Sequence, residues 1–315
     1  MLSKQSPKNI VIPIHRPQKF SDFIGHDQIK KTIKTLISAS KKRNDILEHI
    51  LFYGPSGVGK TSLAYIISNE LNARLHIVQG PQLVTPADLI NSLSLIQKGD
   101  IFFIDEIHSI GNSIKEILLS VMEDFKISIL IGKDFNSKLT SMNLPKFTLI
   151  GATTLLGKIS EPLEERFGIC LHVDFYTVSE IKLLLKKHSD LWKLNLTDNE
   201  LELIANASKG IPRIALKILR RIQDFRLINS AYSIEKIFYE LNIDKNGLKK
   251  IDLSYLNLLG DRPVGLSSIT QLLQIDVLTI LTKIEPYLLK KGWILKTSRG
   301  RCITKEGKKV ICKNI

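Results

Sequence analysis

A glycine-rich segment at positions 54–61, GPSGVGKT, matches the pattern G-x-x-x-x-G-K-[ST]. It follows the apolar run 49–54, which is typical of a buried parallel strand. It precedes residues 61–72, where leucine and isoleucine recur with the spacing of one helix face. Glycines in such a loop allow backbone N–H groups to converge on phosphate oxygens at the helix N-terminus. The sequence therefore predicts an α/β fold with a phosphate-binding loop (P-loop).

Side chains suited to nucleotide hydrolysis follow this loop. Lys60 is expected to reach the β- and γ-phosphates, and the Thr61 hydroxyl is expected to join the shell of a Mg²⁺ ion. The run IFFIDE at 101–106 reads as an apolar strand that ends in two carboxylates, the Walker B arrangement. Asp105 is expected to position Mg²⁺ and Glu106 to activate the attacking water. Acidic residues also end strands in ordinary turns, but their pairing with a P-loop favours hydrolysis over binding alone.

A third apolar run, FTLIGATT at 147–154, ends in hydroxyl groups. Thr154 is placed to sense the γ-phosphate or the attacking water, and a strand that simply ends in threonine is the alternative. Arg166 is a candidate for stabilising transition-state charge in a neighbouring subunit. From residue type alone, a surface salt bridge of Arg166 with Glu164 or Glu165 is the favoured interpretation.

The net charge points to a polyanionic partner. The 315 residues include 45 Lys and Arg against 31 Asp and Glu, a formal charge of +14. From Lys249 to the end there are 13 basic and 5 acidic residues, a net of +8. Nucleic acid and a membrane surface both attract such charge. No amphipathic helix with an aromatic face occurs in this basic region, so nucleic acid is favoured over a membrane.

Other features of the composition predict a cytoplasmic protein. No apolar run reaches the roughly 18 residues that a membrane span needs. The N-terminal segment MLSKQSPKNIVIPIHRP lacks the apolar core and cleavage site of a secretion signal. The three cysteines, Cys170, Cys302 and Cys312, have no metal-binding spacing and are odd in number, as expected in a reducing compartment.

The basic C-terminal region also has a recognisable pattern of elements. Residues from about 253 to 312 are predicted to form helix, turn, helix and then a β-wing. Ser267 is expected to cap one helix, and 277–289 to form the next. The wing strands are predicted at 293–296 and 301–304. The residues predicted to contact backbone phosphates are Lys296, Arg299 and Arg301. Such contacts do not depend on the base sequence.

Ten motifs taken in order resemble the RuvB family of AAA+ ATPases. They are GPSGVGKTS, IFFIDEIH, VMEDF, FTLIGATT, ERFGI, DFYT, GIPRIALKILRR, RPVGL, EPYLLKKGWI and TSRGR, and they extend from the P-loop nearly to the C-terminus. The resemblance implies a P-loop AAA+ domain with a parallel sheet at 1–177. It also implies a small helical lid at 178–247 and a winged-helix DNA-binding domain at 248–315.

The resemblance assigns roles that residue type alone leaves open. It implies that Arg16 lies near the adenine and ribose, that Tyr176 lies where the two ATPase subdomains meet, and that Thr154 is sensor 1. It makes Arg166 the arginine finger and Arg213 sensor 2. The nucleotide-contacting set that it implies is Arg16, Gly57, Gly59, Lys60, Thr61, Ser62, Glu123, Asp124, Phe125, Tyr176 and Arg213.

The function implied by the resemblance is an ATP-driven, Mg²⁺-dependent motor. Such a motor forms a homohexameric ring on duplex DNA and drives branch migration of Holliday junctions with RuvA in recombination and repair, in the cytoplasm at the nucleoid. A RuvC-like resolvase is a second candidate partner. The segment 127–145 is expected to form the hairpin that docks on RuvA through Ile129, Ile131 and Leu139. A hairpin buried against its own domain is the alternative.

Two other functions remain alternatives, and four residues depart from the family pattern, one of them His15 in place of a common leucine. A clamp-loader-like or initiator-like AAA+ ATPase is one alternative, and a non-catalytic, nucleotide-gated DNA-binding protein is the other. Leu155, Glu164 and Lys296 stand where the family usually has arginine. None of the four removes a predicted catalytic group. Lys296 keeps the charge but loses the bidentate geometry of arginine.

Overall fold

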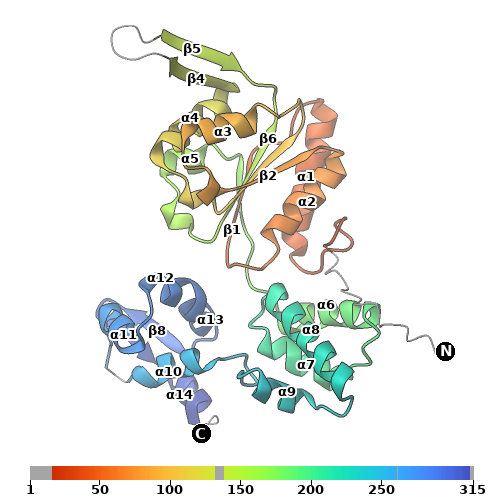
Figure 1. Cartoon of the computed structure of the whole chain (residues 1–315), viewed down its shortest axis with the longest axis vertical. Coiled ribbons are helices and arrows are strands. Elements are labelled where there is room, and N and C mark those ends of the chain that lie inside the picture. The colour runs from red at the N-terminus through yellow and green to blue at the C-terminus, as the bar shows by residue number, and fades with distance from the viewer. Residues whose placement is uncertain (1–15, 132–137, 261, 313–315) are drawn as a thin grey trace, which may run out of the picture.

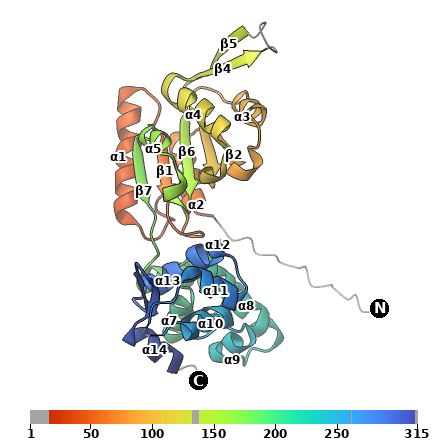
Figure 2. The same cartoon turned by 90° about the vertical axis from the view of Figure 1, so that its left-hand side faces the viewer.

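The computed structural model describes residues 16–131, 138–260 and 262–312. A domain built on a parallel sheet forms one end of the molecule, and two smaller helical bodies lie beside each other at the other end (Figure 1). The chain enters the sheet domain first, then the body made of α6 to α9, and finally the body made of α10 to α14 (Figure 2). This order agrees with the predicted sequence of ATPase, lid and winged-helix regions.

The central sheet has five parallel strands in the order β2-β3-β6-β1-β7. The strands are β1 (Ile50–Tyr53), β2 (Leu75–Gln79), β3 (Ile101–Asp105), β6 (Thr148–Thr153) and β7 (Ile169–His172). Successive side chains of β1, β3 and β6 are buried on both faces of the sheet, which is why their sequences are continuous apolar runs. The P-loop follows β1, and the Walker B carboxylates lie at the end of β3. Because the strands are parallel, both motifs lie at the same edge of the sheet.

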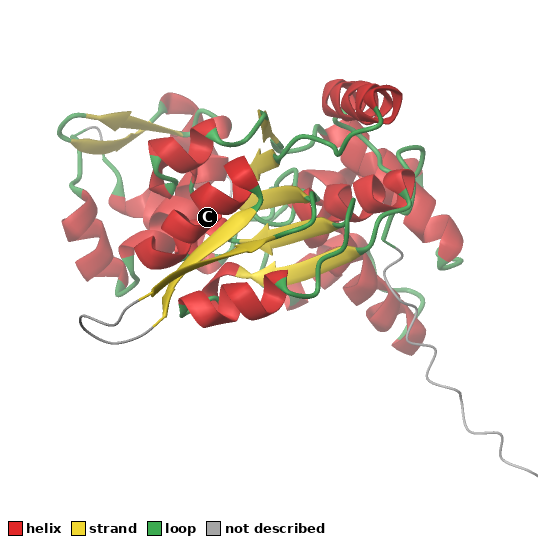
Figure 3. Ribbon diagram, turned by 90° about the horizontal axis from the view of Figure 1, so that it is seen from above, coloured by secondary structure: helices red, strands yellow, loops and turns green. Residues whose placement is uncertain are grey.

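Helices cover both faces of the sheet (Figure 3). One face packs on α1 (Asp27–Arg43) and α2 (Lys60–Leu71), with Phe52 in that core. The other face packs on α3 (Pro86–Leu93), α4 (Asn112–Asp124) and α5 (Glu161–Glu165). Within the described residues of the domain, 3₁₀ turns lie at Gly80–Gln82, Ile107–Ser109 and Leu156–Lys158. The predicted helix at 61–72 is thus α2, which begins at Lys60.

The segment predicted to form a hairpin does so. Strands β4 (Lys126–Ile131) and β5 (Lys138–Asn143) pair antiparallel, with Lys126 opposite Asn143. The hairpin projects from the sheet domain at the end opposite the two smaller bodies (Figure 1). The side chains predicted to contact RuvA lie outside the described part of the chain.

The lid consists of four helices, α6 (Val178–Leu191), α7 (Asp198–Ala207), α8 (Pro212–Ile228) and α9 (Ile234–Glu240). Capping boxes at Thr177 and Thr197 start α6 and α7, each with a glutamate three residues later. The apolar core of the lid is continuous with the core between the sheet and α1 and α2. The lid therefore shares buried surface with the domain that carries the P-loop.

The C-terminal body has its own apolar core and the predicted helix-turn-helix-wing order. Its helices are α10 (Lys250–Leu258), α11 (Leu266–Leu273), α12 (Val277–Thr279), the π-helical turn Ile280–Ile284, α13 (Glu285–Lys290) and α14 (Lys305–Cys312). The prediction that Ser267 caps a helix is wrong, because Gly265 precedes the first turn and α11 begins at Leu266. The capping preference of serine was outweighed by the extended backbone at Gly265.

The wing strands differ by one residue from the prediction. They are β8 (Ile294–Thr297) and β9 (Gly300–Ile303), joined by residues 298 and 299. Gly300 pairs with Thr297, and only glycine fits there, because its φ is 142° and a Cβ would lie 2.3 Å from the carbonyl oxygen of Val264. Val264 also pairs with Arg301, so β9 is flanked on both sides.

Two ion pairs link the winged-helix body to the rest of the chain. Lys209 Nζ in the lid lies 2.6 Å from Asp252 Oδ2, and the two side chains are only 11% and 5% exposed. Lys290 Nζ lies 3.0 Å from Asp174 Oδ2, next to the segment that joins sheet and lid. The loop before α8 therefore touches the winged-helix body.

Candidate active site

A cavity of about 950 Å³ lies where the P-loop edge of the sheet faces the lid. Ten of the predicted site residues line this cavity, and they come from the N-terminal segment, the P-loop, β3 and the lid. They are Arg16, Gly57, Gly59, Lys60, Thr61, Ser62, Asp105, Glu106, Tyr176 and Arg213. Residues from four distant parts of the sequence therefore meet at one site.

The P-loop holds Lys60 in a buried position. Its Nζ donates hydrogen bonds to the carbonyl oxygens of Gly54 at 2.7 Å and Pro55 at 2.8 Å. Burial lowers the pKa of Lys60 to about 8, although the carboxylates of Glu106 and Asp105 oppose the shift. The ammonium group is thus anchored at the start of α2, where the N-terminal dipole also favours anions.

Thr61 and Asp105 form the second part of the site. Thr61 Oγ1 donates a hydrogen bond to Asp105 Oδ2 at 3.3 Å, although the two residues come from different elements. A hydroxyl next to a carboxylate, both oxygen ligands, suits a hard cation that also binds nucleotide phosphates. In the described part of the chain, no three His, Cys, Asp or Glu residues cluster as metal ligands.

Glu106 is held in place by two neighbours. Its backbone is left-handed, with φ 53°, at the sharp turn that follows β3. Thr154 Oγ1 donates a hydrogen bond to Glu106 Oε2 at 3.0 Å, and His108 Nδ1 lies 3.2 Å from the same oxygen. His108 Nδ1 also lies 3.0 Å from Thr153 Oγ1. Burial lowers the pKa of His108, against the pull of the Glu106 charge.

His108 was not among the predicted site residues. It lies within the motif IFFIDEIH, two residues after Glu106, so its position in the motif was the available signal. Its contact depends on the 3₁₀ turn Ile107–Ser109, which brings its ring back toward the end of β6. This turn was not predicted.

The lid contacts the P-loop directly through Arg213. Its Nη1 donates to Ser56 Oγ at 3.3 Å, and its backbone N–H donates to the carbonyl of Gly57 at 3.3 Å. A Cβ at Gly57, whose φ is 84°, would lie 2.9 Å from Arg213 Cβ. The predicted sensor 2 thus lies against the P-loop, and the glycine allows this close approach.

Aromatic and apolar side chains also line the cavity. The Arg16 guanidinium lies 5.0 Å above the ring of Tyr65, and Tyr176 is buried, which raises the pKa of its hydroxyl. Lid residues that were not predicted also line the cavity, among them Leu184, His188, Leu191 and Leu216. Three of them recur on one face of α6, but only the packed lid shows that this face turns to the cavity.

Arg166 lies apart from this cavity. Its Nη2 forms an ion pair of 2.7 Å with Glu123 Oε2 at the end of α4, and not with Glu164 or Glu165. Glu123, Asp124 and Phe125 were predicted to contact nucleotide, yet they are not among the residues that line the cavity. Phe125 packs against the rings of His49 and Phe147. The structure therefore groups Glu123 with the candidate arginine finger.

The predicted DNA-binding residues lie on the wing. Lys296 and Arg301 are opposite each other in the β8–β9 ladder, and both contact the buried carboxylate of Glu285. Arg299 is exposed in the turn between the strands. Lys296 and Arg301 thus both contact Glu285, whereas Arg299 lies apart from it in the turn.

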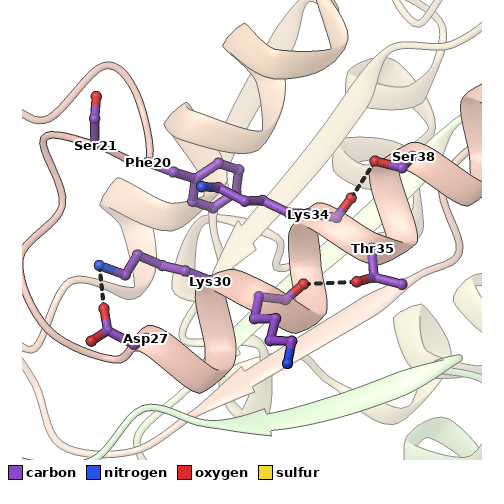
Figure 4. A pocket seen from close by; sticks show the side chains of 8 residues that line it. Phe20, Ser21, Asp27, Lys30, Lys34, Thr35 and Ser38 are labelled. Atoms are coloured by element: carbon purple, nitrogen blue, oxygen red, sulfur yellow. Dashed lines mark hydrogen bonds and ion pairs between the residues drawn. The ribbon is translucent and has the colours of Figure 1, made fainter.

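A smaller cavity of about 590 Å³ lies along α1 and contains several lysines (Figure 4). Lys30 is paired with Asp27 at 2.7 Å, and Lys34 lies 5.4 Å above the ring of Phe20. The hydroxyls of Thr35 and Ser38 donate to carbonyls of their own helix. These polar groups are already engaged, and this cavity lacks the glycine-rich loop of the larger one.

Over the described ranges, no helix is long and apolar enough to cross a membrane.

Family models match nearly the whole chain in three parts. Residues 15–173 match the Holliday junction DNA helicase RuvB P-loop domain. Residues 176–249 match the RuvB AAA lid domain, and residues 245–312 match the RuvB C-terminal winged helix domain.

Individual relatives match over similar lengths. The chain is 46% identical over 302 residues to the Holliday junction branch migration complex subunit RuvB of Mycoplasma genitalium, covering 95% of this chain and 98% of that protein. It is 50% identical over 295 residues to the subunit of the same name from Ureaplasma parvum serovar 3, covering 93% and 94%. A solved structure of the Thermotoga maritima RuvB Holliday junction branch migration motor matches with a TM-score of 0.84 at 36% identity, covering 94% of this chain and 98% of that one.

Proposed function

The chain belongs to the RuvB family of AAA+ ATPases, and on that basis we propose that it is an ATP-driven motor for branch migration of Holliday junctions. The observation that carries this proposal is the set of side chains around Glu106. P-loop, Walker B strand, third strand and lid each contribute to one connected site. A clamp-loader-like ATPase or a non-catalytic DNA-binding protein is less well supported, because the family matches extend through the winged-helix region.

We propose that each residue acts on ATP as its position suggests. The P-loop and Lys60 bind the phosphates, and Thr61 and Asp105 hold Mg²⁺, which supplies charge neutralisation at the phosphates. Glu106 orients and deprotonates the attacking water, with Thr154 holding its carboxylate. Arg213 reports the state of the γ-phosphate to the lid.

The finger role proposed for Arg166 requires a second subunit. Arg166 and the P-loop lie at different places on one chain, so a neighbouring subunit has to bring its own Arg166 to this nucleotide. Such an interface uses two different surfaces and closes into a ring. We propose the homohexamer that the resemblance implied, with duplex DNA gripped by the winged-helix domains at 248–315.

We propose RuvA as the partner that loads the ring at a four-way junction, through the hairpin at 127–145, and a RuvC-like resolvase as a later partner. The lid at 178–247 would transmit the nucleotide state of the domain at 1–177 to the winged-helix domain. The relatives named as subunits of a branch migration complex support this assignment.

A branch-migration assay on a synthetic four-way junction tests the proposal. The full chain should dissociate the junction with ATP and Mg²⁺, and more rapidly when RuvA is added. Lys60→Ala should abolish migration and ATP hydrolysis, whereas the exposed lysine variant Lys31→Ala should behave as wild type. Junction migration by Lys60→Ala at the wild-type rate would contradict the proposed motor.

A further inference from the structure

A buried carboxylate lies beneath the cationic pair of the wing. Glu285 begins α13, and its side chain is 0% exposed. Its Oε1 accepts hydrogen bonds from Arg301 Nε at 2.7 Å and from Tyr255 Oη at 2.9 Å. Its Oε2 lies 3.0 Å from Lys296 Nζ. One internal acid therefore joins both wing strands to α10 and α13.

The geometry of the wing explains why an acid is needed there. Lys296 and Arg301 are cross-strand partners, so their side chains leave the same face of the hairpin. Like charges at directly opposite positions destabilise a hairpin. The negative charge of Glu285 lies between the two cations and removes this repulsion.

The charges at this site favour an ionised Glu285. Burial alone would raise the pKa of its carboxyl, but the contacts with Arg301, Lys296 and Tyr255 outweigh burial, and the pKa lies below its ordinary value. Lys296 remains 46% exposed, whereas Arg301 is 14% exposed. The acid is thus covered completely, and its cationic partners form the layer between it and solvent.

The helix that carries Glu285 is locally irregular. A π-helical turn, Ile280–Ile284, comes directly before it. Such turns are rare and are often found at functional sites, because the extra residue changes the direction of the following side chains. Here Glu285 follows the turn and faces the wing.

We propose that Glu285 is a positioning residue for DNA binding, which holds Lys296 and Arg301 side by side on one face of the wing where they contact backbone phosphates. This inference rests on the proposed function, because it assumes that the wing binds duplex DNA. Glu285 itself does not touch DNA. It acts by setting the arrangement of two cations.

The direction in which DNA affinity changes when the charge of Glu285 is removed distinguishes this role from a simple charge effect. Removing an acid from a DNA-binding surface should strengthen binding to a polyanion if only net charge matters. If Glu285 positions the cations, removing its charge should weaken binding instead. Glu306 in α14 provides the matched control, because it is an exposed acid in the same domain.

Fluorescence anisotropy with the full chain and a labelled 30-base-pair duplex makes the comparison, over a series of salt concentrations. Glu285→Gln should bind about tenfold more weakly, as expected for the loss of one charge-assisted contact, and the slope of log affinity against log salt should fall by about one. Glu306→Gln should bind as tightly as wild type or more tightly. Affinity of Glu285→Gln at or above wild type would overturn the proposal.

Two further variants keep the test meaningful if Glu285→Gln perturbs folding. Glu285→Asp keeps the charge but shortens the side chain by one methylene, so it should fold and still bind DNA more weakly. Lys296→Ala should cost less affinity in the Glu285→Gln background than in wild type, which a purely structural role does not predict. A folded Glu285→Asp protein with wild-type affinity and salt slope would contradict the role of Glu285.

The same experiment separates this inference from the proposed function. ATP hydrolysis without DNA should be unchanged in Glu285→Gln, because the P-loop lies in another domain. A wild-type chain that binds no duplex DNA would contradict the proposed motor itself. Normal DNA binding by wild type together with normal binding by both Glu285 variants would contradict only the positioning role.

Discussion

Thr154 Oγ1 donates a hydrogen bond of 3.0 Å to Glu106 Oε2. The two residues follow β6 and β3, which are neighbours in the sheet. The proposed sensor 1 therefore holds the carboxylate that is proposed to activate water. A γ-phosphate that binds Thr154 would therefore also change the surroundings of the Glu106 carboxylate.

Replacing Thr154 by valine should slow hydrolysis but preserve nucleotide binding. Valine keeps the shape of the side chain and removes the hydroxyl that orients Glu106, so kcat should fall roughly 10- to 100-fold. Steady-state ATPase assays and binding of a fluorescent ADP analogue give the two quantities. Thr35→Val, which removes a hydroxyl bonded only within α1, should leave both unchanged. An equal loss of nucleotide affinity in Thr154→Val would contradict the orienting role.

Nucleotide affinity should fall as pH rises above 8. The pKa of Lys60 is lowered by burial to about 8, so above that pH the free protein holds a neutral amine. Phosphates favour the charged form, so binding should take up close to one proton at pH 9 and almost none at pH 6.5. Calorimetry in buffers of different ionisation enthalpy measures this uptake, and Lys60→Met should abolish it.

The same shift has a defined effect on folding. Because the pKa of Lys60 is lower in the folded chain than the ordinary 10.5, the unfolded chain binds more protons between these two pH values. The contribution of Lys60 to stability should therefore increase with pH from about 8 to 10.5. Urea denaturation of wild type and Lys60→Met over this range isolates the contribution.

Mixed rings should reveal whether Arg166 acts across the subunit interface. Arg166→Ala and Lys60→Ala should each abolish ATP hydrolysis in the presence of DNA. A mixture of the two variants should recover measurable activity, because some interfaces pair an intact P-loop with an intact finger. Arg221→Ala, which removes another exposed arginine of an ion pair, should hydrolyse ATP normally. If mixing restores no activity although the subunits co-assemble, the finger does not act in trans.

Breaking the buried pair between lid and winged helix should destabilise their junction. Lys209→Met leaves the Asp252 carboxylate buried without its cation and should cost about 3 kcal/mol of the free energy of unfolding. Asp252 also accepts from the backbone N–H of Lys249, a cap that asparagine can keep. The double variant Lys209→Met with Asp252→Asn should therefore regain most of the loss.

Hydrogen exchange of α10 measures this stability where it is expected to change. The double-mutant cycle gives the coupling between the two residues. Lys182→Met, which breaks a pair with the exposed Asp198, provides the control and should change stability little. A cycle with no coupling would show that the contact contributes nothing to the junction.

Parts of this architecture were predictable from residue type and spacing. Continuous apolar runs indicated β1, β3 and β6 because strands covered on both faces exclude polar side chains. The P-loop was predictable because phosphate binding requires glycine and lysine at set positions within a few residues. Such signals depend on local chain geometry, which the sequence specifies directly. Predictions that depended on one turn were less accurate, as the displaced wing strands and the cap at Gly265 show.

The tertiary structure decided which side chains meet across the chain. Glu106 contacts Thr154, and Arg213 contacts Ser56 from another domain, because parallel strands end at one edge and the lid packs over it. Glu285 lies under the wing because a π-helical turn and a two-residue strand connection set its direction. Residue type and spacing alone established the phosphate-binding chemistry and the strands β1, β3 and β6, whereas β2 and β7 were not predicted. Contacts between elements depend on packing and register, and those follow from the whole fold and not from any one segment.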